Sequence, residues 1–415
     1  MKRDVAKERR RKRPRCIHKF QEFELNIKDE DRISELEDDI LVSIISKLEL
    51  KEAMATSLLS SRWRYLPTRI THLALCVFNP KLKPSEEIID KWFDFVLAKR
   101  VEVLKIHTGL HRPFYKLSDL IGKKPLRPGL NFLKELSLSA VDLDDAEFEL
   151  LLTTFPLLET LSIDSFKNLR NVKIVDNLFR LKHLSLRGLE LGSLEIGNAM
   201  NLVSLKCYIR IDNLVKLYNV PKLIELATDH RGFAGNLLIQ ILSTSPSCIL
   251  AQLRVLRVST SILAFWPEDM HKIDLINIQH LDLTIYMYDD MVRFTNCLLP
   301  LIGAWPSLEK LDIKFLWRRS RFKFEGETHQ ILYDMWARNN NKSFNSKLVK
   351  KLHISGYLGC EGERQLVMCI MKNYGVQELV VEVCDYTHKM RRWATARACQ
   401  HFSTPQSPLK KITII

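Results

Sequence analysis

An apolar stripe of helical spacing marks the first patterned part of the chain. Between residues 31 and 48, hydrophobic side chains recur at steps of three and four, the spacing of one face of an α-helix. The stripe consists of Ile33, Leu36, Ile40, Ile44 and Leu48, with Leu41 and Ile45 beside it. The pattern predicts an amphipathic helix in this region.

A second helical stretch is predicted from Lys51 to about residue 63. Met54, Leu58 and Leu59 are expected on its buried side, and Pro67 prevents the helix from continuing. Two or three helices over about forty residues make a core that is marginal by itself. We therefore expect a partner or a neighbouring domain to cover part of this apolar surface.

A different pattern follows and recurs to the end of the chain. It has the form LxxLxL, in which Ile, Val, Cys or Thr replaces Leu at some positions, and it occurs fourteen times. The copies begin at Ile70, Val101, Leu133, Leu158, Leu181, Leu191, Leu202, Leu223, Leu253, Ile278, Leu308, Val349, Val376 and Leu409. Most copies begin 21 to 33 residues after the previous one, with shorter steps between Leu181 and Leu202.

This repeated pattern predicts stacked β-strands. The last two apolar positions are two residues apart, so they point to the same side of a strand. One unit cannot bury that side alone, whereas stacked units share a continuous core beneath a curved parallel sheet. Chance Leu-rich helices would not restore the same phase in every copy. Residues 144–152 and 236–242 are predicted to be helices between the strands.

The charge of the chain is concentrated at its start. The net charge is +14, and half of it lies in residues 2–15, where nine Lys and Arg outnumber two acidic residues. We expect residues 1–28 to be a disordered basic leader. Such a block is typical of a nuclear-import signal or a weak polyanion-binding tail, and a plain solvated tail is the alternative.

Composition narrows the class of protein further. Hydrophobic residues make up 46% of the 415 residues, which excludes wholesale disorder. The nine cysteines show no zinc-site spacing, and no apolar run reaches the length of a membrane span. The charged start is followed by no apolar signal-peptide core. We expect a protein of a reducing compartment, the nucleus and/or the cytoplasm, with no membrane contact.

Residues 31–67 resemble an F-box of the plant type. The resemblance is carried by Asp31-Arg32-Ile33-Ser34-Glu35-Leu36, Asp38-Asp39-Ile40-Leu41, Ile44-Ile45-Ser46-Lys47-Leu48, Lys51-Glu52-Ala53, Thr56-Ser57-Leu58-Leu59-Ser60 and Arg62-Trp63-Arg64-Tyr65-Leu66. Glu37 and Glu49 stand where the family commonly has proline, and Pro67 stands where a tryptophan is usual. The resemblance implies that the segment binds a SKP-type adaptor and, through it, a cullin. The implied adaptor contacts are Leu36, Ile40, Leu41, Ile44, Leu58 and Trp63.

The repeats resemble the leucine-rich repeats of plant F-box proteins, and residues 348–383 resemble the FBD segment that closes many of them. There, a predicted strand leads into a turn with Gly356 and Gly359, followed by a helix and a strand over 377–383. The buried side of that helix carries Leu366, Ile370, Met371 and Tyr374.

The expected fold class is α/β: a small helical F-box module followed by a leucine-rich-repeat solenoid, with a curved parallel sheet and helices on its convex side. The expected domains are the basic leader 1–28, the F-box 29–68, the solenoid 69–345 and an FBD-like cap 346–415.

Substrate contacts are expected on the concave face of the solenoid. The residues between the apolar positions of each strand should face it, namely Ser137, Ser162, Ser185, Glu195, Lys206, Ala227, Arg257, Asp282, Asp312 and His353. Rigid strand faces suit protein recognition, so we expect Lys206, Arg257, Asp282 and Asp312 to contact a protein substrate. The alternative is that they are solvated strand residues.

A segment rich in aromatic and basic residues is a second candidate for substrate binding. The candidates are Trp317, Arg318, Arg319 and Arg321. Aromatic and Arg side chains are enriched at binding hot spots. A packed loop whose arginines extend along apolar surface is the plain alternative.

No catalytic constellation is present in the sequence. It contains no Walker A loop, HExxH, GxSxG or dinucleotide fingerprint, and adjacent acidic pairs such as Asp38-Asp39 do not converge on one point. We expect no enzyme activity, cofactor or metal. The leading hypothesis is a substrate-recognition subunit of an SCF-type ubiquitin ligase.

Two other functions remain open. An adaptor-independent interaction scaffold is motivated by Glu37, Glu49 and Pro67. A nuclear nucleic-acid-binding protein is motivated by the basic leader and the segment at Trp317, but the rest of the chain lacks a continuous basic stripe.

Overall fold

The computed structural model describes the chain from residue 33 onward, with gaps. The described residues are 33, 35–48, parts of 52–66, 72–76, 101–107, 132–141, 143–164, 168–176, 179–230, 237–260, 275–287, 298, 302–303, 305–317, 349–385, 387–402 and 411–415. The basic leader and three of the proposed substrate contacts, Arg318, Arg319 and Arg321, lie outside them.

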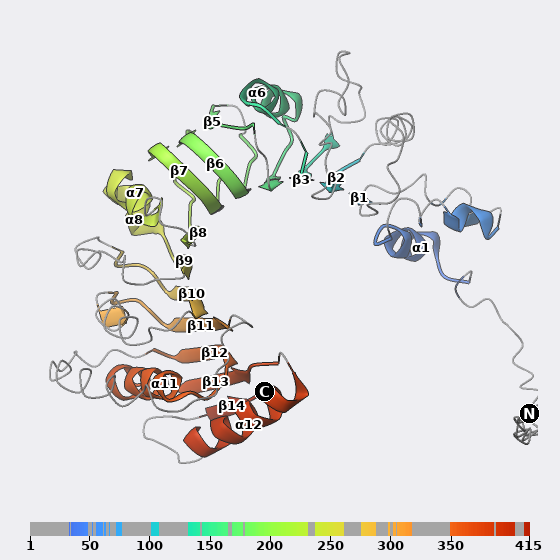
Figure 1. Ribbon diagram of the computed structural model, residues 1–415. Helices are drawn as coiled ribbons and strands as arrows, with labels where there is room; N and C mark the ends of the chain where they lie inside the picture. The colour runs from blue at the N-terminus through green and yellow to red at the C-terminus, as the bar shows by residue number, and fades with distance from the viewer. Residues whose placement is uncertain are drawn as a thin grey trace, which may run out of the picture.

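The strands form one open parallel sheet that follows an arc (Figure 1). They are β1 (His72–Cys76), β2 (Val103–His107), β3 (Glu135–Ser139), β4 (Thr160–Asp164), β5 (Asn171–Val175), β6 (His183–Gly197), β7 (Ser204–Tyr218), β8 (Glu225–His230), β9 (Val255–Thr260), β10 (His280–Met287), β11 (Lys310–Trp317), β12 (Lys351–Tyr357), β13 (Glu378–Val383) and β14 (Lys411–Ile414). Their order in the sheet is their order in the chain, except that β5 pairs only with β6. The predicted fold class is confirmed.

Helices cover the outer side of the arc (Figure 1). They are α6 (Asp145–Thr154), α7 (Leu237–Thr244), α8 (Ser247–Gln252) and α11 (Glu361–Tyr374). Another helix, α12 (His388–Phe402), lies at the C-terminal end, and α1 (Asp38–Ile45) and the 3₁₀ turn η1 (Thr56–Leu58) precede the sheet. The helices expected over 144–152 and 236–242 are confirmed. A capping box starts α6, where the Asp144 carboxylate accepts from the Glu147 N–H at 2.8 Å.

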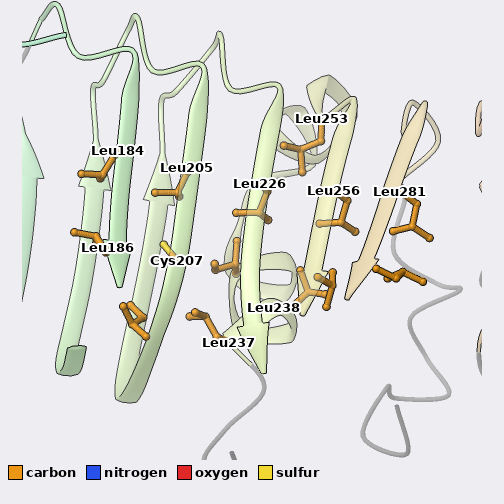
Figure 2. Packing of buried hydrophobic residues seen from close by; sticks show 14 of the residues in the cluster. Leu184, Leu186, Leu205, Cys207, Leu226, Leu237, Leu238, Leu253, Leu256 and Leu281 are labelled. Atoms are coloured by element: carbon orange, nitrogen blue, oxygen red, sulfur yellow. The ribbon is translucent and has the colours of Figure 1, made fainter. Parts of the chain in front are cut away.

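The core is a ladder of leucines in register across the strands (Figure 2). Leu184, Leu205, Leu226, Leu256 and Leu281 are direct partners on successive strands, and each is at most 1% exposed. Burying one leucine side chain stabilises a fold by about 1.5–3 kcal/mol. Since each strand covers its neighbour in the same way, the predicted phase of the repeats is confirmed.

The copy of the pattern at Leu191 is not a repeat of its own. β6 first pairs with β4 through residues 183–187, and Gly188 then adopts a positive φ of 63°. Residues 193–197 of the same strand pair with β5, which lies on the outer side of the arc. Glu195 therefore lies in this second ladder, and its predicted place on the concave face is wrong. The motif recurs because both ladders bury apolar side chains in the same core.

Short polar side chains follow the last residues of the second ladder, which is formed by β5 and the C-terminal parts of β6 and β7. Asp176, Asn198 and Asn219 have positive φ values of 62°, 54° and 49°, a conformation that Asp and Asn tolerate. The Asn198 amide donates to Asp176 at 2.8 Å, and the Asn219 amide donates to Asn198 at 2.6 Å. These bonds fix successive repeats to one another at this corner.

Strands β12, β13 and β14 end the sheet, and α11 lies between the first two of them in the chain. The predicted buried residues of α11 are at most 6% exposed, and Gly375 ends the helix in the left-handed conformation. The Glu363 carboxylate is fully buried and accepts from the N–H groups of Gly359 at 2.7 Å and Cys360 at 3.1 Å. It also accepts from Leu358 at 3.1 Å, so one side chain holds the turn between β12 and α11.

Candidate functional site

The first helix has a buried face and an exposed apolar face. Leu41 and Ile45 are 0% exposed and belong to the same buried cluster as the strands. Ile40 and Ile44, each one residue earlier, are 47% and 41% exposed. A helix that exposes two isoleucines side by side offers contact area for another protein.

The second half of the F-box-like region differs from its prediction. Leu58 and Leu59, expected on the buried side of a helix, are 87% and 68% exposed. Of the described residues there, Glu52, Ala55, Arg62 and Trp63 are helical and the three-residue turn η1 lies between them. Trp63 and Leu66 supply the buried side chains. Helical spacing shows which side chains share a face but does not show whether that face is covered.

Arg62 connects the two halves of this region. Its Nε donates to the Asp38 carboxylate at 2.9 Å, and its Nη2 donates to the Leu36 carbonyl at 2.6 Å. This role of Arg62 was not predicted, although the residue lies within a motif that resembles the F-box. Just before the helix, Glu37 has φ −62° and ψ 150°. Proline adopts the same φ, so glutamate at this position requires no change of backbone.

The six predicted adaptor contacts therefore divide into two groups. Ile40, Ile44 and Leu58 are exposed, and Leu36 is half-buried, whereas Leu41 and Trp63 are inside the protein and stabilise it. Ile33 and Leu59 are also exposed but were not predicted as adaptor contacts. The resulting candidate surface, here called the helical surface, consists of Ile33, Ile40, Ile44, Leu58 and Leu59.

The concave face carries the predicted row of polar residues. Lys206, Ala227, Arg257, Asp282 and Asp312 are direct partners on β7 to β11. Most of the charged residues in the row form ion pairs with one another or with neighbouring side chains. The Arg257 guanidinium binds Asp282 at 2.6 Å and also binds a carboxylate on β8, that of Glu225, at 2.7 Å.

A second cluster surrounds Asp312. One of its carboxylate oxygens lies 2.7 Å from His280 Nε2 and 2.6 Å from Lys310 Nζ. Burial acts to raise the pKa of Asp312, but the hydrogen bonds with His280 and Lys310 outweigh it, so the pKa lies below its usual value. His353 is 3.8 Å away on the next strand. The cluster is a prearranged patch of both charges rather than a set of free ligands.

The predicted substrate contacts thus have different surroundings. Within the described residues, Lys206 has no carboxylate oxygen within 4.0 Å, whereas Arg257, Asp282 and Asp312 are already in ion pairs. Trp317 is half-buried, and its indole donates to the Gly356 carbonyl at 3.1 Å. Contact of these residues with a substrate stays a prediction.

Replacing Arg257 with methionine is expected to lower the free energy of unfolding by about 1 kcal/mol at pH 7, because Glu225 and Asp282 lose their counter-ion. Burial raises the pKa of Glu225, but the hydrogen bond from Arg257 contributes to a net pKa below the usual 4.5. A carboxyl group whose pKa is lowered by folding stabilises the fold above pH 4.5, and this stabilisation is lost as the pH falls. Urea unfolding of the wild type and Arg257→Met at pH 7 and pH 4 should show a smaller difference in unfolding free energy at pH 4.

The matched control is Lys105→Met, which breaks an exposed ion pair with Glu135 on the same face. We expect a change within about 0.5 kcal/mol. An effect as large as that of Arg257→Met would show that partial burial of the ion pair is unimportant.

Within the described residues, no helix is both long and apolar enough to cross a bilayer. The same residues contain no group of three or more His, Cys, Asp and Glu side chains that could hold a metal ion.

Comparison with known proteins identifies the two parts of the chain. Residues 33–70 match the family model of the F-box domain, and residues 125–408 match the model described as At1g61320/AtMIF1, LRR domain. The chain belongs to the F-box/leucine-rich-repeat proteins. Neither of the two matched domains is an enzymatic one.

Similar F-box/leucine-rich-repeat proteins occur in Arabidopsis thaliana. F-box/LRR-repeat protein At4g14103 is 38% identical over 116 residues, which cover 27% of this chain and 29% of that protein. Putative F-box protein At1g32020 is 31% identical over 90 residues, or 21% of this chain and 46% of its own length. F-box/FBD/LRR-repeat protein At5g56420 is 51% identical over 81 residues, or 19% of each chain. The chain thus spans less than half the length of these relatives.

Proposed function

We propose that this F-box/leucine-rich-repeat protein is the substrate-recognition subunit of an SCF-type ubiquitin ligase. The observation that carries the proposal is the helical surface, which exposes Ile40, Ile44 and Leu58 on an F-box joined to a long solenoid. The F-box binds a SKP-type adaptor and, through it, a cullin. The solenoid holds a protein substrate near the transferring enzyme, and such positioning needs no catalytic residue of this chain.

The test is co-expression with a SKP-type adaptor and a cullin, followed by quantitative pull-down. The double variant Ile40→Asp/Ile44→Asp is expected to weaken adaptor retention by at least about thirtyfold, since central apolar contacts contribute about 2 kcal/mol or more. The aspartates would be solvated in the free protein, so the fold should persist.

Leu150→Asp serves as the matched control, because Leu150 is a 53% exposed leucine on the distant helix α6. It should retain the adaptor fully. Equal retention by the Ile40/Ile44 variant would exclude the helical surface. A wild-type chain that retains no adaptor would instead favour the adaptor-independent scaffold.

We further propose that substrate binds the concave face beside Lys206, which interacts electrostatically with Glu225 but makes no ion pair within 4.0 Å among the described residues. With the proteasome blocked, Lys206→Glu should change the set of captured proteins while adaptor retention stays unchanged. An unchanged set would remove Lys206 from the site.

We also propose that the protein acts in the nucleus and/or the cytoplasm, on the basis of the basic residues 2–15. A fluorescent fusion should lose nuclear signal when these lysines and arginines are replaced by glutamine. The same distribution for both fusions would leave the basic segment without an import role.

A further inference from the structure

An exposed apolar patch lies on the edge of the solenoid where the parallel strands begin, away from both surfaces described above. Phe179, Met200 and Ile224 are 65%, 45% and 42% exposed, and they come from the turns before β6, β7 and β8. Val203 and Pro221 lie in the same turns. These five residues are here called the edge patch.

The turns of the edge patch are held side by side. The Asn201 side-chain amide donates to the Phe179 backbone carbonyl at 2.6 Å, and the Lys222 ammonium donates to the Asn201 side-chain oxygen Oδ1 at 2.7 Å. The Val203 N–H donates to the Lys182 carbonyl, and the Ile224 N–H donates to the Val203 carbonyl. The patch is therefore part of a rigid ladder, and its apolar side chains are presented in fixed positions.

Basic residues lie within the turns of the edge patch and in the turn that follows it. The turns 179–182, 200–203, 221–224 and 251–254 contain four basic residues and no acidic one. Arg180, Lys222 and Arg254 are exposed, and Lys182 binds Glu159 on the preceding repeat at 2.7 Å. An apolar centre with a charged rim has the anatomy of a protein-binding surface.

We propose that the edge patch binds an acidic amphipathic helix of another protein. Three neighbouring turns at strand spacing extend over about 10 Å, which matches about two turns of an α-helix. Apolar side chains at positions i, i+3 or i+4, and i+7 of that helix would meet the patch, and flanking Asp or Glu would meet Arg180, Lys222 and Arg254.

Other occupants fit the charges less well. A second copy of the chain has a net charge of +14, and its segment 2–15 has the same sign as the rim. A flat anionic bilayer would also touch Glu159 and Glu309, which lie in the same ladder on either side of the patch. A bound helix of two turns would contact only the part of the ladder that lies between Glu159 and Glu309.

The proposal is tested by mRNA display of a random library of 16-residue peptides, in which each peptide is linked to the mRNA that encodes it. The full chain is the bait. A counter-selection against the variant Met200→Glu/Ile224→Glu discards peptides that bind outside the patch. The recovered peptides are expected to be acidic, with apolar residues at helical spacing. They should bind this variant at least about tenfold more weakly than the wild type.

Charge is tested separately with Arg180→Gln/Arg254→Gln, which should weaken the recovered peptides about threefold to tenfold at low salt. Lys105→Gln/Lys314→Gln removes the same number of charges on strands away from the patch and should have no effect. Since all four side chains are exposed, thermal unfolding should be nearly unchanged in both variants.

Three outcomes would overturn the proposal: no peptide that distinguishes the patch variant, recovered peptides without an acidic bias, or loss of phosphatidylserine-vesicle binding in Met200→Glu/Ile224→Glu. None of these results depends on adaptor retention, so the proposal and the ligase function can fail independently.

Discussion

Replacing Gly356 with alanine is expected to lower the free energy of unfolding by about 2–5 kcal/mol. Gly356 has a φ of +73°, and a Cβ atom there would lie 2.2 Å from the Phe315 carbonyl oxygen on the neighbouring strand β11. The left-handed conformation costs a non-glycine residue about 1–2 kcal/mol. The clash adds about 1–3 kcal/mol because the obstructing atom is backbone and cannot rotate away.

Urea unfolding followed by tryptophan fluorescence measures this effect. Gly192→Ala is the matched control, because the nearest atoms to its added Cβ would be 3.5 and 3.7 Å away and its φ is not in the left-handed range. We expect a change below about 1 kcal/mol there. Equal midpoints for the two variants would contradict the close approach of β11 and β12 at Gly356.

The stability of the protein is expected to fall as the pH rises from about 5 to 8, and Glu363 is expected to be a main cause. Burial raises the pKa of Glu363 to about 7, although three backbone N–H groups act to lower it. A raised folded-state pKa stabilises the fold below the unfolded value of 4.5, and this contribution is lost as the pH passes 7. Each unit of pKa difference between the folded and unfolded states corresponds to about 1.4 kcal/mol, so the stabilisation that is lost amounts to about 3 kcal/mol.

The variant Glu363→Gln isolates this contribution. Glutamine keeps an oxygen that can accept from the Gly359 N–H but does not titrate. The difference in unfolding free energy between the wild type and Glu363→Gln should change by about 3 kcal/mol between pH 5 and pH 8.

Glu309→Gln is the control, because Glu309 is exposed and pairs with Lys350 at the surface. Its pH profile should run parallel to that of the wild type. Parallel profiles for Glu363→Gln as well would show that the buried carboxyl does not titrate in this range.

The amino-acid sequence determined the phase of every repeat. A position two residues from another apolar position lies on the same side of a strand, so Leu184, Leu205 and Leu226 could be aligned before any contact was known. Local signals also determined α6 and the segment from Gly356 to the end of α11. The order of residues on the concave face followed from the same alternation.

Only the tertiary structure decided what covers each apolar side. It placed Leu194 and Ile196 in a second ladder, which turned Glu195 away from the concave face. It exposed Leu58 and Leu59 and enclosed Trp63. It also gathered Phe179, Met200 and Ile224 on one edge, although more than forty residues separate the first from the last.

The physical reason is that periodicity and burial are different kinds of information. The spacing of side chains is a property of the local backbone and can be read from neighbours in the sequence. Burial and ion pairing, as of Arg257 between Glu225 and Asp282, depend on which distant segments are brought into contact. The sequence therefore defined the faces of this protein, and its folding determined which of them remain open to a partner.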